Sequence, residues 1–234
     1  MPWSGGARVV SPYEAAASEV ASALAGRPVS IECHSEVSWE RLAGGLGVNP
    51  ARSWAITPYH SVARDRIAPD DVAHFSPRAC RFADAFWRAP AELGTRTCFM
   101  RVPVGRLRQT QPKGECGDWS AKLTAVHVLS HESMHLYGFY GEANAECLGV
   151  QLDAYVAVAF GADERFARSL AREYWSDYYV PRDDAYRSLA CREGGGLDLF
   201  PTRRGWPTPS AYPADLGAAL AAMERRIRAG GGSP

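Results

Sequence analysis

The stretch Ser130–Gln151 reads SHESMHLYGFYGEANAECLGVQ and decides how the middle of the chain folds. Its first part holds an H-E-x-x-H pattern, in which His131 and His135 stand four residues apart and Glu132 follows the first histidine. On a helix, side chains four residues apart lie on one face, so both imidazoles can reach a single metal ion. This pattern is the core of a zinc hydrolase site, and it predicts a bound zinc ion with Glu132 as the general base.

The sequence around the pattern favours a helix. Residues 119–137 contain neither proline nor glycine, and apolar residues recur through this run. Asp118 is the predicted N-cap and Gly138 the predicted C-cap. The competing interpretation is an amphipathic helix whose histidines face solvent or a satisfied core. We favour the interpretation in which the two histidines bind a metal ion.

A third ligand is expected close to the two histidines, because a catalytic zinc usually has three protein ligands and one position open to water. Downstream, Gly138 and Gly141 bracket a tight turn into a second helix, which carries Glu142 and Glu146 at helical spacing. If the chain reverses midway between the glycines, Glu146 lies opposite the histidines. If the chain reverses at Gly138, Glu142 is instead the first acid to lie opposite the histidines. The hairpin geometry therefore leaves both acids open as the third ligand.

His127 lies on the same stripe as the two histidines of the pattern, one helical turn earlier. All three cannot bind one ion, because eight residues along a helix span about 12 Å. His127 is therefore predicted to contact the ligands and not the metal. The remaining histidines are far away in the sequence and receive no role: His34, His60 and His74.

The segment Leu123–Gln151 resembles the metal-binding region of gluzincin metallopeptidases. The pattern Glu142-x-x-Ala145-Glu146 is similar to their E-x-x-A-D/N signature, in which the first acid binds zinc and the second orients a ligand histidine. The resemblance therefore implies that Glu142 is the third zinc ligand and that Glu146 holds a histidine from outside the coordination shell.

More narrowly, the chain resembles a group of uncharacterised actinobacterial metallopeptidases. These share a similar hairpin and a segment like Tyr186–Pro207, which here reads YRSLACREGGGLDLFPTRRGWP. Two departures stand out. A metzincin would carry histidine or aspartate three residues after Gly138, where this chain has Gly141, so a metzincin site is disfavoured. Gluzincins also separate their third ligand from the histidines by many more residues than this chain does.

The composition is that of a folded enzyme. A chain of 234 residues, 46% hydrophobic and 11% aromatic, can bury one sizeable core. We predict a single domain over 1–234, made of a helix and strand part (7–117), a metal-site hairpin (118–160) and C-terminal helices with a Gly/Pro-rich loop (161–234). The formal net charge is zero, so neither nucleic acid nor an anionic membrane is a predicted partner.

The expected location is the cytoplasm. No apolar run approaches the length of a membrane span, and the N-terminus lacks the layout of a signal peptide. The six cysteines include no C-x-x-C pair, which argues against a structural zinc cluster. They are either reduced, buried thiols or disulfides of a protein exported by another route, and both alternatives stay open. No oligomeric state is predicted.

The order of the predicted elements favours an α+β, zincin-like fold, mainly helical, with a small sheet packed on the active-site helix. Strands are expected at 28–33, 53–57 and 71–75, with another possible at 98–104. Either of the last two could be a sheet edge that holds an extended peptide, although a plain structural strand is the commoner case. Helices are expected over the following residues: 11–25, 77–88, 118–137, 142–160, 163–178 and 214–228.

These features predict a zinc-dependent hydrolase that cleaves peptide bonds in a peptide or protein substrate. Glu132 would take a proton from the activated water and pass it to the leaving amine. The alternatives are a non-catalytic binding or regulatory protein derived from a zincin, and a zinc-dependent enzyme acting on a small amide. Intact Glu132 favours catalysis, because a structural zinc has no use for a general base. Candidate donors to the reacting oxygen are several arginines and the following tyrosines: Tyr155, Tyr178, Tyr179 and Tyr186.

Overall fold

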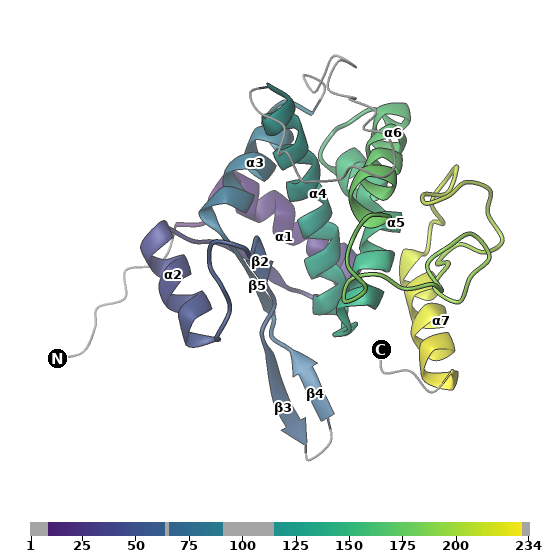
Figure 1. The fold of residues 1–234 in the computed structure, drawn as a ribbon, viewed down its shortest axis with the longest axis horizontal. Helices are drawn as coiled ribbons and strands as arrows, with labels where there is room; N and C mark the ends of the chain where they lie inside the picture. Colours follow the sequence, from purple (N-terminus) through teal and green to yellow (C-terminus); the bar gives the residue numbers. More distant parts are fainter. Residues whose placement is uncertain (1–8, 64–65, 91–114, 231–234) are drawn as a thin grey trace.

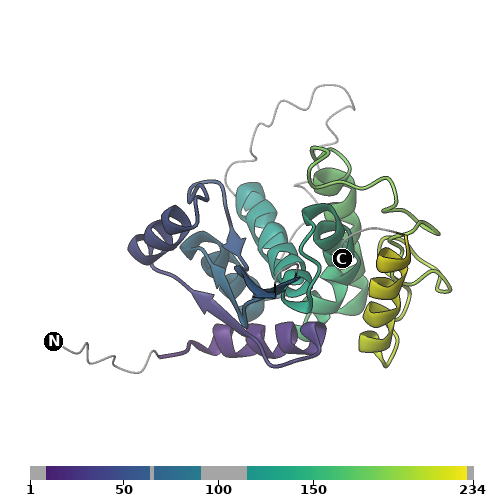
Figure 2. The same cartoon turned by 90° about the horizontal axis from the view of Figure 1, so that it is seen from below.

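The protein has an α+β fold built around a central pair of antiparallel helices. The structure is a computed structural model, and it describes residues 9–63, 66–90 and 115–230. Helices α4 (Glu115–Tyr137) and α5 (Glu142–Ala159) lie side by side at the centre of Figure 1. In the perpendicular view of Figure 2, the strands lie on one side of α4 and the C-terminal helices on the other, while the purple helix of residues 12–25 runs beneath α4.

The remaining elements follow in chain order. They are α1 (Pro12–Ala25), β1 (Ser30–Cys33), α2 (Glu36–Gly45), β2 (Ala55–Ile56), β3 (Tyr59–Ala63), β4 (Arg66–Pro69), β5 (Val72–Phe75), α3 (Pro77–Arg88), α6 (Glu164–Tyr174), a π-helical segment (Trp175–Tyr179) and α7 (Leu216–Ala229). The predicted helix at 77–88 is confirmed at both ends, whereas α2 and the β3–β4 hairpin were not predicted. The helix expected at 163–178 changes to π-helix after Tyr174. The possible strand at 98–104 lies outside the described residues.

Helix α1 begins with a capping box formed by Ser11 and Glu14, and Glu14 also contacts the sheet. Glu14 Oε2 accepts from the Ser11 backbone N–H at 2.8 Å, and Glu14 Oε1 accepts from the Cys33 N–H at 2.7 Å. One turn later, the Ser18 hydroxyl accepts a hydrogen bond from the N–H of residue 31, and a further turn on, the Ser22 hydroxyl accepts one from the N–H of residue 29. Side chains of α1 therefore occupy the outer edge of β1, which removes that edge from pairing with another strand.

The three-stranded sheet has the order β1-β5-β2. Strand β5 pairs parallel with β1 and antiparallel with β2, so it is the central strand. Residues 71–75 are therefore a plain structural strand, the alternative that the sequence favoured, and not a peptide-binding edge, because both of their hydrogen-bonding sides are used within the sheet. With β1 covered by α1, β2 is the remaining edge of this three-stranded sheet.

Helix α4 is buried over most of its circumference. Apolar side chains such as Leu123, Leu129 and Met134 are 0% exposed, and the polar residues of the H-E-x-x-H pattern are also buried. A helix buried on several faces belongs to the interior of the fold and not to its surface. It begins at Glu115, three residues before Asp118, the predicted N-cap. Arg27 donates to the carbonyl of Leu136 at 3.0 Å and thereby fixes the C-terminal end of α4.

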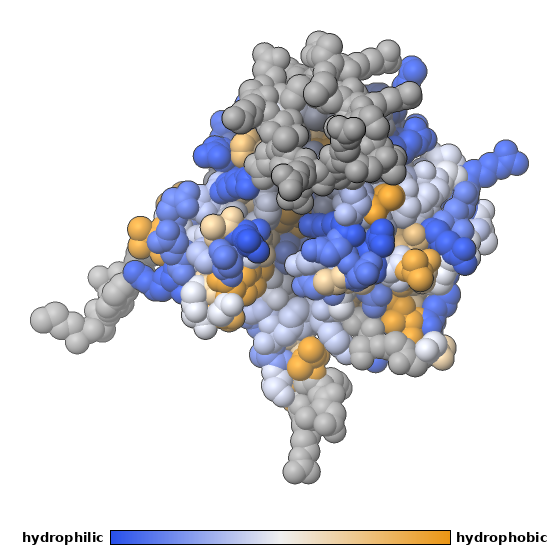
Figure 3. All heavy atoms as spheres, viewed as in Figure 1, coloured by the Kyte–Doolittle hydropathy of each residue, from blue (hydrophilic) through white to orange (hydrophobic). Residues whose placement is uncertain are grey.

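Among the described residues, two disulfides join neighbouring elements, which agrees with one of the two alternatives left open for the cysteines. Cys33 of β1 is bonded to Cys80 of α3, and Cys147 of α5 is bonded to Cys191 in the loop before α7. On the face shown in Figure 3, hydrophobic residues form small separate patches among hydrophilic ones. None of the helices in the described ranges combines the length and apolar character needed to cross a membrane.

Candidate metal centre

The turn between α4 and α5 brings the two acids back over the histidines. Gly138 adopts a φ of 123°, which L side chains rarely adopt, and its N–H is bonded to the carbonyl of His135 at 2.9 Å. Gly141 is the N-cap of α5. The chain therefore reverses within the few residues from Gly138 to Gly141, and α5 runs back along α4.

Gly149 allows the two helices to approach closely. A Cβ atom at this position would lie 3.1 Å from both Cα and N of His131, and 3.4 Å from Cε1 of His127. The His131 atoms are backbone, so they cannot rotate away. The absence of a side chain at Gly149 thus sets the distance at which the acids of α5 meet the histidines of α4.

We expect Gly149→Ala to push α5 away from α4. Overpacking of this kind costs about 1–3 kcal/mol of unfolding free energy, and the same shift should weaken metal binding. Thermal unfolding and a zinc titration would measure both effects. Gly44→Ala is the control, because a Cβ at Gly44 of α2 meets nothing within 4 Å. Equal zinc affinity in the two variants would contradict this role of Gly149.

Three side chains converge at the open end of the hairpin. The Nε2 atoms of His131 and His135 lie 3.0 Å apart. Glu142 Oε2 is 3.3 Å from Nε2 of His131, and Glu142 Oε1 is 3.6 Å from Nε2 of His135. Ligands held tetrahedrally at zinc–ligand distances of 2.0–2.1 Å are separated by about 3.3–3.4 Å. These side chains could therefore hold one metal ion, and they are the three that the resemblance to gluzincins implies.

The two imidazoles present lone pairs to the same point. The carbonyl of Phe139 can only accept, so its 2.8 Å contact assigns the proton of His135 to Nδ1 and leaves a lone pair on Nε2. The carboxylate of Glu146, 3.0 Å from His131 Nδ1, favours the same tautomer there. Two lone pairs 3.0 Å apart beside a carboxylate repel one another unless a cation lies among them. The donor set therefore fits a metal ion.

Glu142 faces solvent. Burial raises the pKa of its carboxyl, but in the metal-free protein the hydrogen bonds and charges of protonated His131 and His135 outweigh burial and hold the pKa well below its usual range. Its side chain is 48% exposed, whereas the His131 and His135 side chains are 10% and 6% exposed. Solvent can therefore reach this group from the Glu142 side, as a site with an open coordination position requires.

Glu146 lies behind His131, on the side away from Glu142. Its Oε2 atom is 3.0 Å from His131 Nδ1 and 3.2 Å from His127 Nε2. Neither contact has hydrogen-bonding geometry, so both are close electrostatic contacts. Its Oε1 atom accepts from the Tyr174 hydroxyl at 3.2 Å and pairs with the Arg182 guanidinium. This position agrees with the predicted orienting role and places Glu146 away from the shared point of the other ligands.

His127 contacts the residues behind the candidate metal ligands. Its Nδ1 atom lies 3.1 Å from Asp153 Oδ1, and the ring of Tyr174 stacks on its imidazole at 3.8 Å. Burial lowers the pKa of His127 to about 4, against the opposing charge and hydrogen bond of Asp153. His127, His131 and Glu146 could also hold an ion, but all three are buried, and Glu146 already pairs with Arg182. The Glu142 group suits a catalytic ion better, because it is open to solvent.

Glu132 is held beside the candidate ligands by Thr57, which directly follows β2. It is 6% exposed, and its Oε2 atom accepts from the Thr57 hydroxyl at 2.6 Å. One carboxylate oxygen is thus fixed, and the other remains for proton transfer. Tyr59, two residues after Thr57, donates to the carbonyl of His135 at 3.1 Å. Burial raises the pKa of Tyr59, and the charges of Glu132 and Glu142 raise it further, so its hydroxyl stays protonated.

Among the four tyrosines named from the sequence, Tyr186 lies within electrostatic range of the centre. Burial raises the pKa of Tyr186, and Glu142 is the next largest cause, with Glu132 also contributing. The Arg182 guanidinium lies 4.8 Å above its ring. The other three are engaged elsewhere: Tyr155 with Tyr212, Tyr178 with Ser120, and Tyr179 with Ser188.

The sequence interpretation missed several residues around this centre. Asp153 could have been found from the sequence, because it lies two helical turns after Glu146 and so on the same face of α5. Thr57 and Tyr59 had no such sequence signal, since Thr57 follows a two-residue strand and Tyr59 begins a hairpin, and neither element was linked to the motif. Arg182 follows the π-helical segment, and no local pattern relates it to Glu146.

Comparison of the chain with protein-family models, with curated proteins and with solved structures finds no significant match. The functional interpretation therefore depends on the residues of the site itself.

Proposed function

We propose that the protein is a zinc-dependent hydrolase of peptide bonds with a zincin-like fold. The observation that carries this proposal is the convergence of His131, His135 and Glu142 at a solvent-facing point. A buried carboxylate, Glu132, lies next to this group on the same helix. A structural metal site is usually closed by four protein ligands and needs no neighbouring base, whereas a hydrolytic site needs both an open position and a base.

Zinc bound here would supply Lewis acidity, lowering the pKa of water to about 7 and polarising the scissile carbonyl. The protein supplies the proton transfers. Glu132 accepts the proton of the attacking water on its free oxygen and delivers it to the leaving nitrogen. The Thr57 hydrogen bond keeps the carboxylate in one orientation. Glu146 and Phe139 orient the two imidazoles.

Tyr186 is the proposed donor to the oxyanion that develops on the scissile carbonyl. Its side chain comes from the segment after α6, whereas the general base comes from α4, so the two can approach a substrate from different elements. The raised pKa of Tyr186 keeps its hydroxyl protonated and able to donate. Arg182, over its ring, restricts the position of the side chain.

An extended peptide could bind along β2. This strand is the edge of the sheet that α1 leaves uncovered, and it leads directly into Thr57, which contacts the general base. Main-chain hydrogen bonds to such an edge would place a peptide beside Glu132 with little dependence on side-chain sequence. We therefore propose peptides in extended conformation as the substrate class.

The experiment is a zinc-dependence assay with a diverse peptide library. Purified protein is stripped with a chelator, and cleavage is compared before and after zinc is restored. The proposal predicts that the stripped protein is inactive and that zinc restores cleavage. Bound zinc with no turnover of any peptide would favour a binding or regulatory protein. Turnover of small amides alone would assign the enzyme to that substrate class.

A further inference from the structure

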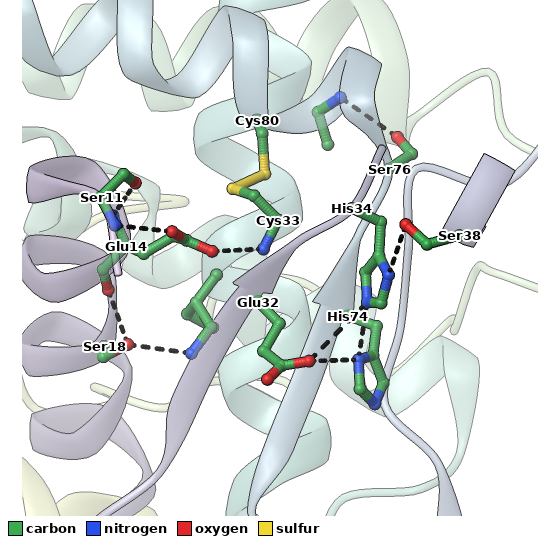
Figure 4. The surroundings of a disulfide bond; sticks show 12 residues. Ser11, Glu14, Ser18, Glu32, Cys33, His34, Ser38, His74, Ser76 and Cys80 are labelled. Atoms are coloured by element: carbon green, nitrogen blue, oxygen red, sulfur yellow. Dashed lines mark hydrogen bonds and ion pairs between the residues drawn. A yellow bond between two sulfur atoms is a disulfide. The ribbon is translucent and has the colours of Figure 1, made fainter. Parts of the chain in front are cut away.

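A second set of metal-ligating side chains lies on the outer face of the three-stranded sheet. Glu32 of β1 and His74 of β5 are register partners on neighbouring strands, so their side chains leave the same face. His34 follows β1, two residues after Glu32, and its N–H continues the ladder to the carbonyl of Phe75 at 3.0 Å. Figure 4 shows the imidazoles of His34 and His74 and the carboxylate of Glu32 pointing toward one another.

The three potential ligand atoms have the spacing of a metal site. His34 Nε2 is 2.9 Å from His74 Nδ1 and 3.9 Å from Glu32 Oε2, and His74 Nδ1 is 3.3 Å from the same oxygen. These separations bracket the about 3.3–3.4 Å expected between ligands around tetrahedral zinc. They also resemble the separations of 3.0, 3.3 and 3.6 Å in the hairpin group.

The ligand set is held by rigid structure. Two of its members are fixed by the pairing of β1 with β5, and the disulfide from Cys33 to Cys80 lies between Glu32 and His34 in the sequence. Ser38 Oγ lies 3.3 Å from His34 Nδ1, which orients the ring so that Nε2 faces the other two side chains. Preorganisation of this kind lowers the cost of gathering ligands around an ion.

The site is shielded yet reachable. The His34 and His74 side chains are 16% and 17% exposed, and that of Glu32 is 30% exposed. We infer that Glu32, His34 and His74 form a second binding site for a divalent transition-metal ion. Two imidazoles and one carboxylate suit zinc, with water completing the coordination. An ion at this position fastens β1 to β5, and His74 is in turn the register partner of Ile56, the residue before Thr57.

Metal stoichiometry tests this inference independently of any hydrolytic activity. The full chain is stripped of metal and titrated with zinc by calorimetry, with metal content measured after dialysis. We expect about two zinc ions per chain in the wild type and about one in the double variant His34→Ala/His74→Ala. The double variant His131→Ala/His135→Ala should also keep about one, bound at the sheet. Circular dichroism checks that each variant is folded.

His60→Ala is the matched control. His60 of β3 lies 2.7 Å from a carboxylate oxygen of Asp70. The substitution therefore removes a histidine that contacts a carboxylate, but it changes neither proposed metal site. Its stoichiometry should equal that of the wild type. If the histidine variants do not fold, Glu32→Gln should still weaken the sheet site about tenfold or more.

Equal zinc binding by the wild type and the His34→Ala/His74→Ala variant would overturn the inference. It would assign the three side chains to a hydrogen-bond chain that needs no metal. If the wild type binds one ion and only the His131→Ala/His135→Ala variant loses it, the sheet site is absent and the metal site between α4 and α5 stands. If the wild type binds one ion and only the His34→Ala/His74→Ala variant loses it, the sheet site stands and the proposed function fails.

Discussion

Glu132→Gln is expected to bind zinc like the wild type and to lose most of its hydrolytic activity. Glutamine has nearly the same shape and can still accept the Thr57 hydrogen bond, so the helix and the three ligands should stay in place. It cannot accept a proton from water at neutral pH. Loss of a general acid and base typically lowers the rate by about 10²–10⁴-fold. The measurements are kcat/KM on a cleaved peptide and zinc content after dialysis.

Glu164→Gln serves as the control for Glu132→Gln. Glu164 is an exposed acid in the first turn of α6, where it pairs with Arg168 at 3.1 Å, and its side chain is 71% exposed. The same chemical change there should leave kcat/KM near the wild-type value. Unchanged cleavage by Glu132→Gln would remove Glu132 from the mechanism. Loss of zinc together with activity would instead assign it a role in building the site.

Those parts of the fold that depend on nearby residues were predicted well from the sequence. The capping box of α1 and the helix at 77–88 follow from local rules, since each uses a proline and a cap within a single turn. The β3–β4 hairpin was missed because its residues are partly exposed and show little alternation. The π-helical turn at 175–179 was read as ordinary helix, since a widened turn leaves no clear mark in an aromatic-rich sequence.

The same division between local and distant contacts applies to the metal centre. His131, His135 and Glu142 are joined by one helix and one short turn, so their spacing limits where they can lie. The Thr57 contact with Glu132 spans 75 residues, and the Arg182 contact with Glu146 spans 36. Contacts at such separations are set by how the sheet and the C-terminal segment pack on the hairpin, and no periodicity encodes that packing.

Glu142→Gln and Glu146→Gln are expected to separate the ligand from the orienting residue. Glu142→Gln removes the charged oxygen atoms that face both Nε2 atoms, so zinc affinity should fall by more than the 10–100-fold typical of residues around the ligands. Glu146→Gln should lower zinc affinity by about 10–100-fold, because it acts through the orientation of His131. Zinc titration of the two purified variants measures the difference.

In the metal-free protein, we expect Glu146→Gln to lower the free energy of unfolding more than Glu142→Gln does, which is the opposite of their order in zinc affinity. The Glu146 side chain is 1% exposed and pairs with Arg182, whose side chain is 35% exposed, so Glu146→Gln leaves a partly buried cation without its anion. We expect a loss of about 1–3 kcal/mol in unfolding free energy, reduced from the fully buried case by solvent at Arg182. Glu142→Gln should lower stability less, since the Glu142 side chain is 48% exposed and solvent screens its charge interactions with the histidines. A Glu146→Gln variant that loses more zinc than Glu142→Gln would make Glu146 the third ligand, because a purely orienting carboxylate cannot outweigh a coordinating one.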